Sequence, residues 1–337
     1  MIAANPRSNE NDHRIATLPV LVLFPHSRCN CRCVMCDIWR IRQIREITAS
    51  DLQPHLDSLR ALKVRWVVLS GGEPQLHSDL AALSALIRNE NIRLTLLTAG
   101  LMLKSQALLV TRLVDDVIVS LDGPPAVHDQ IRGIPNAFER LASGVAAVRE
   151  LRSGFPISAR CTIQKMNHRL LRETLKTAKK MGLNSISFLA VDVNSRAFNR
   201  PDGWADDRQD TVALKASEVE QLGSEVEALI REHAEDLSSG FVAENAEKLH
   251  RLPRHFQAHL GQVEPVAPRC NAPWVSAVIE ADGSVRPCFF HPTIGNINEA
   301  PFQHIVNGER AIRFREGLDV ASNPTCRNCV CSLYLDN

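Results

Sequence analysis

The chain has 337 residues, of which 45% are hydrophobic and 23% charged, a composition typical of folded globular proteins. This length allows at most two or three domains, and the composition excludes a disordered or collagen-like chain. Because 39 Lys and Arg residues stand against 38 Asp and Glu residues, the net charge of +1 argues against a nucleic-acid or anionic-membrane partner. The longest apolar run, residues 18–24, is too short to cross a bilayer, and the first 17 residues carry no secretory signal. We therefore expect a cytoplasmic protein.

Short apolar runs alternate with amphipathic stretches from residue 17 to 191. The predicted strands are Leu18–Phe24, Trp66–Ser70, Arg93–Thr98, Val117–Leu121, Ile157–Ile163 and Ser185–Ala190. The predicted helices are Ser50–Leu62, Ser78–Asn89, Lys104–Leu113, Ala137–Leu151 and Leu170–Met181. Ser50 and Ser78 are expected to cap two helices at their N-termini, and Gly182 to end the last helix. Strands that alternate with helices of this length indicate βαβ units and a parallel sheet, and six units fit a partial (β/α)6 TIM-like barrel.

The alternation stops after Val191. Residues 194–210 are predicted to form a solvated polar loop, residues 215–235 a long helix, and residues 243–260 a helix broken at Pro253. A small α+β unit follows Cys270, with strands at 275–279 and 285–287 around an Asp282-Gly283 turn, and a helix at 303–315. We therefore divide the chain into a polar tail (1–16), a barrel core (17–191), a helical extension (192–265) and a C-terminal domain (266–337).

Nine of the ten cysteines fall in two clusters, one near each end of the chain. The cysteines are Cys29, Cys31, Cys33, Cys36, Cys161, Cys270, Cys288, Cys326, Cys329 and Cys331. A reducing compartment does not preserve structural disulfides, so clustered cysteines in this setting more often bind metal. Cys161, alone on a predicted strand, is expected to be a small buried side chain.

The first cluster contains the spacing C-x3-C-x2-C, formed by Cys29, Cys33 and Cys36. Three thiolates on one loop can hold three irons of a [4Fe–4S] cluster and leave the fourth iron open to another ligand. Zinc is the alternative, but its ligands usually come as two separated pairs, and this spacing is tight for such a site. We interpret Cys31 as a bystander.

Together with the motifs that follow it, this loop resembles the radical S-adenosylmethionine (SAM) superfamily. Ser70-Gly71-Gly72-Glu73-Pro74 ends the second predicted strand and matches the GGE motif of that family, whose members use it to hold the amino group of SAM. The resemblance implies that further SAM contacts come from strand ends. The expected cofactor-binding residues are Gly71, Gly72, Glu73, Thr98, Ser120, Asp122 and Arg160. A His128-Asp129-x-x-Arg132-Gly133 segment stands where many members carry a similar loop.

The chemistry that the resemblance implies is reductive cleavage of SAM at the [4Fe–4S] cluster. The cleavage yields methionine and a 5′-deoxyadenosyl radical, which abstracts a hydrogen atom from the substrate. The electron is expected to come from a donor of the flavodoxin or ferredoxin type. The protein itself would orient the reactants and exclude side reactions.

The second cluster resembles the auxiliary-cluster domains, of the SPASM and shorter twitch types, that many radical SAM enzymes carry. Cys270, Cys288, Cys326 and Cys329 match the twitch pattern, which implies one auxiliary [4Fe–4S] cluster, although Cys331 could replace Cys329 as the fourth ligand. Four ligands would give a closed cluster that passes electrons, and three would leave an iron free for substrate. Zinc remains the alternative for these two separated pairs. His291 and Pro292 follow Cys288 and could reach the auxiliary cluster, but a turn histidine is the preferred interpretation.

The sequence therefore predicts a radical SAM oxidoreductase with two [4Fe–4S] clusters. Its expected reaction is oxidation, dehydrogenation or cross-linking of a small molecule or a peptide. Two alternatives stay open: a redox-neutral radical SAM epimerase, mutase or decarboxylase, and a non-catalytic zinc-binding protein. No residue is assigned as a catalytic acid, base or hydrogen donor, since fold and clusters do not name a substrate.

Overall fold

The computed structural model describes residues 13–336, so most of the predicted tail at 1–16 lies outside the described residues. The chain divides into two compact units. Unit 1 is built from residues 13–27, 43–94 and 267–336, and unit 2 from residues 28–42 and 95–266. Among the described helices, none combines the length and the apolar character needed to cross a membrane.

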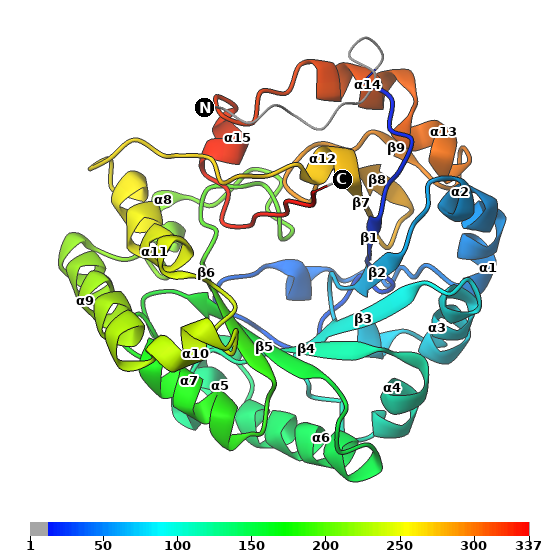
Figure 1. Cartoon of the computed structure of the whole chain (residues 1–337). Coiled ribbons are helices and arrows are strands. Elements are labelled where there is room, and N and C mark those ends of the chain that lie inside the picture. Colours follow the sequence, from blue (N-terminus) through cyan, green and yellow to red (C-terminus); the bar gives the residue numbers. More distant parts are fainter. Residues whose placement is uncertain (1–12, 337) are drawn as a thin grey trace. The chain divides into compact units, whose positions relative to one another are not determined.

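Unit 2 contains the last four residues of β3 (Arg93–Thr98) and the parallel strands β4 (Asp116–Ser120), β5 (Ile157–Ile163) and β6 (Ser185–Ala190). The strands are connected by α4 (Ala107–Leu113), α5 (Pro125–Arg132), α6 (Ala137–Leu151) and α7 (Leu171–Lys180), and in Figure 1 α5, α6 and α7 lie along one side of β4–β6. Strands β3, β5 and β6 begin and end at the predicted residues. Helix α5 was not predicted.

Alternate residues of β5 point to opposite faces of the sheet, as the two-residue repeat of a strand requires. Ala159 and Cys161 are buried, as are both ends of the strand, whereas Ser158, Arg160 and Thr162 are partly or largely exposed. This pattern separates an apolar, covered face from a face that carries polar side chains. Cys161 belongs to the covered face, as expected for a small buried side chain.

Four helices follow β6 in unit 2. They are α8 (Asp206–Gln209), α9 (Ala216–Glu232), α10 (Ala234–Ser238) and α11 (Ala246–His259). Helix α9 packs against both α7 and α11. The predicted break at Pro253 is wrong, because α11 continues through this proline with Leu249, Leu252 and Phe256 buried along one side. Packing of this apolar side outweighs the local cost of the proline.

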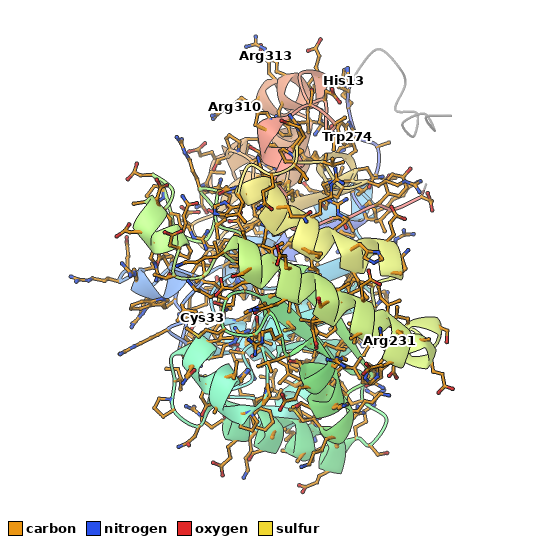
Figure 2. All side chains as sticks on the ribbon, turned by 90° about the vertical axis from the view of Figure 1, so that its left-hand side faces the viewer. His13, Cys33, Arg231, Trp274, Arg310 and Arg313 are labelled. Carbon is orange, nitrogen blue, oxygen red and sulfur yellow. The ribbon has the colours of Figure 1, made fainter. Side chains whose placement is uncertain are left out.

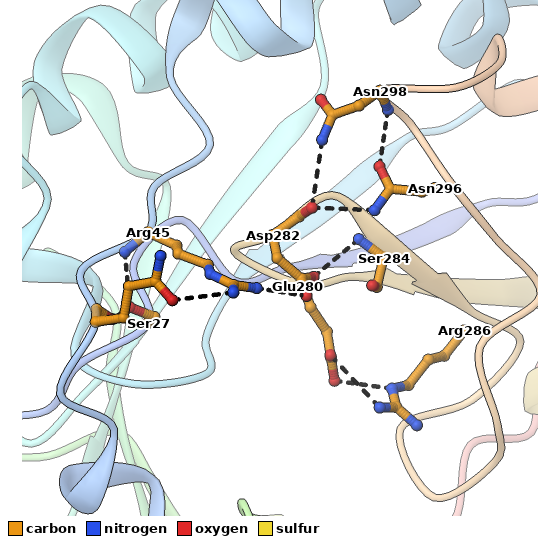
Figure 3. A network of polar contacts seen from close by, with 9 residues as sticks. Ser27, Arg45, Glu280, Asp282, Ser284, Arg286, Asn296 and Asn298 are labelled. Atoms are coloured by element: carbon orange, nitrogen blue, oxygen red, sulfur yellow. Dashed lines mark hydrogen bonds and ion pairs between the residues drawn. The ribbon is translucent and has the colours of Figure 1, made fainter.

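Unit 1 contains the parallel strands β2 (Trp66–Leu69), β1 (Val20–Leu23) and β7 (Ser276–Ile279), in that order, followed by antiparallel β8 (Ser284–Arg286) and β9 (Gly295–Asn296). The predicted turn between β7 and β8 is confirmed: Gly283 has φ +84°. Figure 3 shows how Asn296 and Asn298 donate to the carbonyl of Asp282, while Arg45 pairs with the Asp282 carboxylate at 3.1 Å.

The helices of unit 1 are short. They are α1 (Ala49–Leu52), α2 (Leu56–Ala61), α3 (Leu80–Asn89), α12 (Ala272–Val275), α13 (Phe302–Val306), α14 (Glu309–Glu316) and α15 (Pro324–Arg327). The single helix predicted at 303–315 is therefore two helices, with Gly308 between them. Arg310 and Arg313 of α14 extend outward into solvent (Figure 2), whereas Arg315 is buried and donates to the carbonyls of His13 and Val306.

Both predicted N-caps are off by one or two residues. Thr48 rather than Ser50 caps α1, through a capping box with Asp51, and Asp79 rather than Ser78 caps α3 by accepting from the backbone N–H of Ala82. In both helices the N-cap is the residue whose side-chain oxygen accepts the backbone N–H of the residue three positions later in the chain. Gly182 follows α7 with φ +71°, the left-handed conformation expected after a helix end.

Candidate functional site

The first four cysteines lie in one segment of unit 2, residues 29–36, which we call the cysteine loop. Two backbone hydrogen bonds attach this loop to the end of α5: Arg32 N–H donates to the Arg132 carbonyl at 2.9 Å, and Val34 N–H to the Ile131 carbonyl at 3.0 Å. Gly133, with φ +64°, ends α5, and a Cβ there would approach the Arg32 carbonyl oxygen to 2.5 Å. The Arg132-Gly133 pair of the sequence motif therefore holds the cysteine loop in place.

Arg132 also connects the cysteine loop to the end of β4. Its Nη2 atom forms an ion pair with Oδ2 of Asp122 at 2.5 Å, and its Nη1 atom lies 3.6 Å from Sγ of Cys33. The other carboxylate oxygen of Asp122 accepts the backbone N–H of Thr162 at 3.0 Å. The side chains of Asp122 and Arg132 are only 0% and 10% exposed, so the pair is an internal one. The sequence assigns Asp122 to SAM binding, but the structure directs its carboxylate to Arg132 and Thr162.

The thiols of the cysteine loop differ in how readily they ionise. A hydrogen bond from Cys31, assisted by the charge of Arg132, lowers the pKa of Cys33 to about 7 despite its burial. The same hydrogen bonding to Cys29 and Cys33 raises the pKa of Cys31. Burial raises the pKa of Cys36 to about 12. The lowered pKa of Cys33 suits a metal-binding thiolate, whereas the raised pKa of Cys31 favours its protonated form, the hydrogen-bond donor to Cys33.

Sequence reasoning missed three residues that hold the other end of the cysteine loop. Arg200 donates to the Met35 carbonyl at 2.5 Å and Arg208 to the Val34 carbonyl at 2.7 Å, while Trp204 Nε1 donates to the Asp37 carboxylate at 2.5 Å.

Both guanidinium groups also lie against the Trp204 ring, with the Cζ atoms of Arg200 and Arg208 at 3.6 Å and 4.6 Å from the ring centroid. The prediction of a solvated loop is therefore wrong for this part of residues 194–210. The spacing of four residues between Arg200, Trp204 and Arg208 is the signal that could have revealed this arrangement.

His128 belongs to the same buried region of unit 2. Its Nδ1 atom accepts the backbone N–H of Asp122 at 3.2 Å, and its Nε2 atom has no hydrogen-bond partner among residues 13–336. Burial, and after it the charge of Arg132, lowers the pKa of His128 to about 3. The imidazole is therefore neutral at pH 7, and it orients the backbone that follows β4.

The GGE motif lies in unit 1, directly after β2. Gly71 has φ +93°, and a Cβ at this position would come within 2.4 Å of the Phe24 side chain, so both the backbone and the packing require glycine. Gly72 follows it. Glu73 is 1% exposed, and one of its oxygens accepts the backbone N–H of Gln75 at 3.2 Å. This bond fixes the carboxylate at the start of a 3-10 helix, Pro74–Leu76.

Ser120 and Arg160 are direct neighbours across β4 and β5, on the polar face of the sheet in unit 2. Arg160 is exposed and Ser120 partly exposed, so a hydroxyl and a guanidinium lie side by side and are accessible. Such a pair can bind a carboxylate, with the guanidinium as the charged donor. Thr98 differs from both, because it is buried and its hydroxyl accepts the backbone N–H of Gly100 at 2.9 Å.

Unit 1 brings together the cysteines of the second cluster. Burial, with smaller contributions from the nearby thiols of Cys270, Cys331 and Cys326, raises the pKa of Cys288 to about 12. Burial likewise raises the pKa of Cys326 to about 11 and that of Cys329, to which Cys331 and Cys288 contribute. Cys270 raises the pKa of all three thiols, so Cys288, Cys326 and Cys329 each lie within electrostatic reach of Cys270. Thiols in such a group lose their protons when metal binds, so the set fits a thiolate-ligated cluster.

Within residues 13–336, no three His, Cys, Asp or Glu side chains are arranged to hold a single metal ion. An iron–sulfur cluster does not require several side chains to converge on one ion. Each of its irons takes one cysteine ligand, so the cysteine sulfurs are separated by the cluster itself.

Two family models match the chain. The radical SAM superfamily matches residues 23–178, and the SPASM iron-sulfur cluster-binding domain matches residues 270–330.

Curated relatives and solved structures agree with these matches. Pre-heme d1 synthase of Dinoroseobacter shibae is 27% identical over 86% of this chain and 73% of its own length. PqqA peptide cyclase of Ruegeria pomeroyi is 25% identical over 93% of this chain and 80% of its own length. The structure of Streptococcus suis SuiB bound to S-adenosylmethionine has a TM-score of 0.67 and 14% identity, covering 96% of this chain and 75% of that one.

These findings confirm the predicted fold, a partial (β/α) barrel followed by a small C-terminal domain, and the predicted cofactors, SAM and [4Fe–4S] clusters. Residues 23–178 therefore match the radical SAM superfamily, and residues 270–330 match a SPASM-type iron–sulfur cluster-binding domain.

Proposed function

We propose that this protein is a radical SAM oxidoreductase in which the second cluster accepts an electron from the substrate. The observation that carries the proposal is the second set of cysteines, which unit 1 gathers and which the SPASM match covers at residues 270–330. A redox-neutral enzyme that regenerates its radical has no need of a second electron carrier. An oxidation needs one, because the substrate radical must lose a further electron.

The proposed reaction balances in two stages. SAM, one electron from an external donor of the flavodoxin or ferredoxin type and a substrate C–H group give methionine, 5′-deoxyadenosine and a substrate radical. The substrate radical then loses one electron to the auxiliary cluster and one proton to solvent or a base, which gives the oxidised product.

We assign the first cluster to Cys29, Cys33 and Cys36, and the auxiliary cluster to Cys270, Cys288, Cys326 and Cys329. The buried end of β4 supports the first assignment, because Arg132 and Asp122 hold the cysteine loop from one side. Arg200 supports it from the other side by its bond to the Met35 carbonyl.

Each unit carries residues that we propose as contacts of SAM, and each set is described within its own unit. Glu73, held by the turn after Gly71 and Gly72, is proposed to accept the amino group of SAM. The carboxylate of SAM is proposed to lie against Arg160 and Ser120, since these neighbours offer a guanidinium and a hydroxyl on one accessible face. Thr98 and Asp122 are proposed to support the SAM site indirectly, because their side chains accept backbone N–H groups and so fix the chain after β3 and β4.

The first substrate class that we propose is a haem-type tetrapyrrole, because the relative named pre-heme d1 synthase matches over 86% of the chain. A peptide is the second class, because the relative named PqqA peptide cyclase matches over 93% of it. The two classes are separated by anaerobic incubation with an iron porphyrin that carries propionate groups, or with a candidate precursor peptide. The substrate is the compound whose mass changes and whose presence increases 5′-deoxyadenosine.

The test of the two clusters is the iron content of the anaerobically reconstituted protein, compared with a Cys29→Ala/Cys33→Ala/Cys36→Ala variant. About eight irons in the natural protein, about four in the variant and 5′-deoxyadenosine from the natural protein alone would support the proposal. About four irons in the natural protein would remove the electron acceptor and with it the oxidative role. Absence of 5′-deoxyadenosine despite both clusters would refute the proposed SAM cleavage.

A further inference from the structure

A histidine lies at the second cysteine site, although its position in the sequence favours a simple turn residue. Nε2 of His291 lies 3.4 Å from Sγ of Cys326, a residue 35 positions further along the chain. The side chain of His291 is only 5% exposed. The contact is therefore a buried one, between an imidazole nitrogen and a cysteine that we assign as a cluster ligand.

Several contacts fix His291 in this orientation. Its backbone N–H donates to the Cys288 carbonyl at 3.0 Å, and its own carbonyl accepts from Arg286 at 2.9 Å. Arg286 is in turn held by Glu280 at 2.8 Å, as Figure 3 shows. The imidazole packs edge-on against the Phe314 ring, with 4.8 Å between centroids. Since backbone and ring are both held, the direction of Nε2 toward Cys326 is set by the fold.

A hydrogen bond to a cluster sulfur changes the energy of the two redox states unequally. Reduction adds negative charge to the cluster and its thiolates, and an N–H aimed at a thiolate stabilises that added charge. The reduction potential then becomes more positive, so the cluster accepts an electron more readily.

We infer that His291 is a positioning residue of the auxiliary site, whose Nε2–H donates to the Cys326 thiolate and raises the reduction potential of the cluster. The inference rests on the proposed function, in which this cluster takes an electron from the substrate radical. It gives that function a physical basis in this chain, because a more positive potential favours electron transfer in the oxidative direction.

The experiment is a redox titration of the full-length chain carrying Cys29→Ala/Cys33→Ala/Cys36→Ala, so that only the auxiliary cluster contributes, followed by electron paramagnetic resonance. His291→Phe keeps a ring against Phe314 and removes the donor. The ratio of reduced to oxidised cluster is expected to fall about tenfold at a fixed potential, a shift of the midpoint by about 59 mV to more negative values for a one-electron couple. His291→Gln retains an N–H, so its midpoint potential is expected to lie between those of the protein with His291 and the His291→Phe variant. His304→Phe, an exposed histidine of the same unit, is the matched control and should leave the midpoint unchanged.

An unchanged midpoint in His291→Phe, with iron retained, would overturn the inference, and so would loss of iron from both His291→Phe and His291→Gln. Loss of iron from the Phe variant alone would support it, since Gln still supplies an N–H. The titration uses neither SAM nor substrate, so it is independent of the proposed reaction. A shifted midpoint in a protein that oxidises nothing would refute the proposed function and leave the role of His291 intact.

Discussion

Replacement of Asp122 by asparagine tests whether this residue is a counter-ion or a ligand of SAM. Asp122→Asn keeps an oxygen that can accept the backbone N–H of Thr162 and removes only the charge that faces Arg132. The Asp122 side chain is fully buried, and its ion pair with Arg132 measures 2.5 Å. Removing one partner of a buried pair leaves the other charge uncompensated, which costs roughly 3–5 kcal/mol. We expect the free energy of unfolding to fall by about this amount.

The assay is equilibrium unfolding in urea, in parallel with SAM binding to the reconstituted protein. Glu232→Gln is the matched control within unit 2, because it removes the charge of a carboxylate that is 41% exposed and paired with Arg172. Its cost is expected to stay below about 1 kcal/mol, as for other surface ion pairs. The double variant Asp122→Asn/Arg132→Met should recover much of the lost stability, since it removes both buried charges.

An unchanged free energy of unfolding in Asp122→Asn, together with a large loss of SAM affinity, would refute this reasoning. That result would instead support Asp122 as a SAM-binding residue, the role expected from its position after β4. Loss of stability without recovery in the double variant would show that the charge pair is not the source of the effect.

Three further predictions concern the same unit. Because the pKa of buried His128 is lowered from 6.5 to about 3, the unfolded chain binds more protons than the folded one between these values. The free energy of unfolding should therefore fall as the pH drops below about 6.5, by about 1.4 kcal/mol per pH unit from this group, and His128→Leu should remove that dependence in the apoprotein. Gly133→Ala places a Cβ 2.5 Å from the Arg32 carbonyl and should lower stability by more than the roughly 1 kcal/mol of conformational strain, with loss of iron from the cysteine loop. Arg160→Gln should weaken SAM binding about tenfold or more while the unfolding free energy changes by less than about 0.5 kcal/mol, since the guanidinium is exposed.

Each of these predictions has an outcome that contradicts it. If the free energy of unfolding of His128→Leu depends on pH as steeply as that of the natural protein, groups other than His128 cause the acid sensitivity. Gly182→Ala is the control for Gly133→Ala, because Gly182 has a similar φ of +71° but nothing within 4 Å of the added Cβ. If both glycine variants lose the same free energy of unfolding, the cysteine loop moves away from the added Cβ without a measurable energetic cost. Normal SAM affinity in Arg160→Gln would exclude this residue from the SAM site.

The sequence by itself predicted the six strands of the barrel in chain order and the motifs typical of the family. Three of its strands, Arg93–Thr98, Ile157–Ile163 and Ser185–Ala190, lie where their apolar runs predicted them. The C-x3-C-x2-C loop and the GGE motif identified the family without any structure. These features are local: an apolar run, a turn or a ligand spacing lies within a few consecutive residues, so the linear sequence displays it completely.

Only the tertiary structure decided which side chains support those motifs. Arg200 and Trp204 reach the cysteine loop from more than 160 positions away, and His291 reaches Cys326 across 35 positions. Asp122 looked like a cofactor ligand because it ends a strand, yet the fold buries it opposite Arg132. A buried charge or a buried donor must find its partner wherever the chain brings one, and no local pattern marks that partner. Sequence spacing therefore predicts which groups bind the clusters, and packing decides which side chains hold the cysteine segments in place.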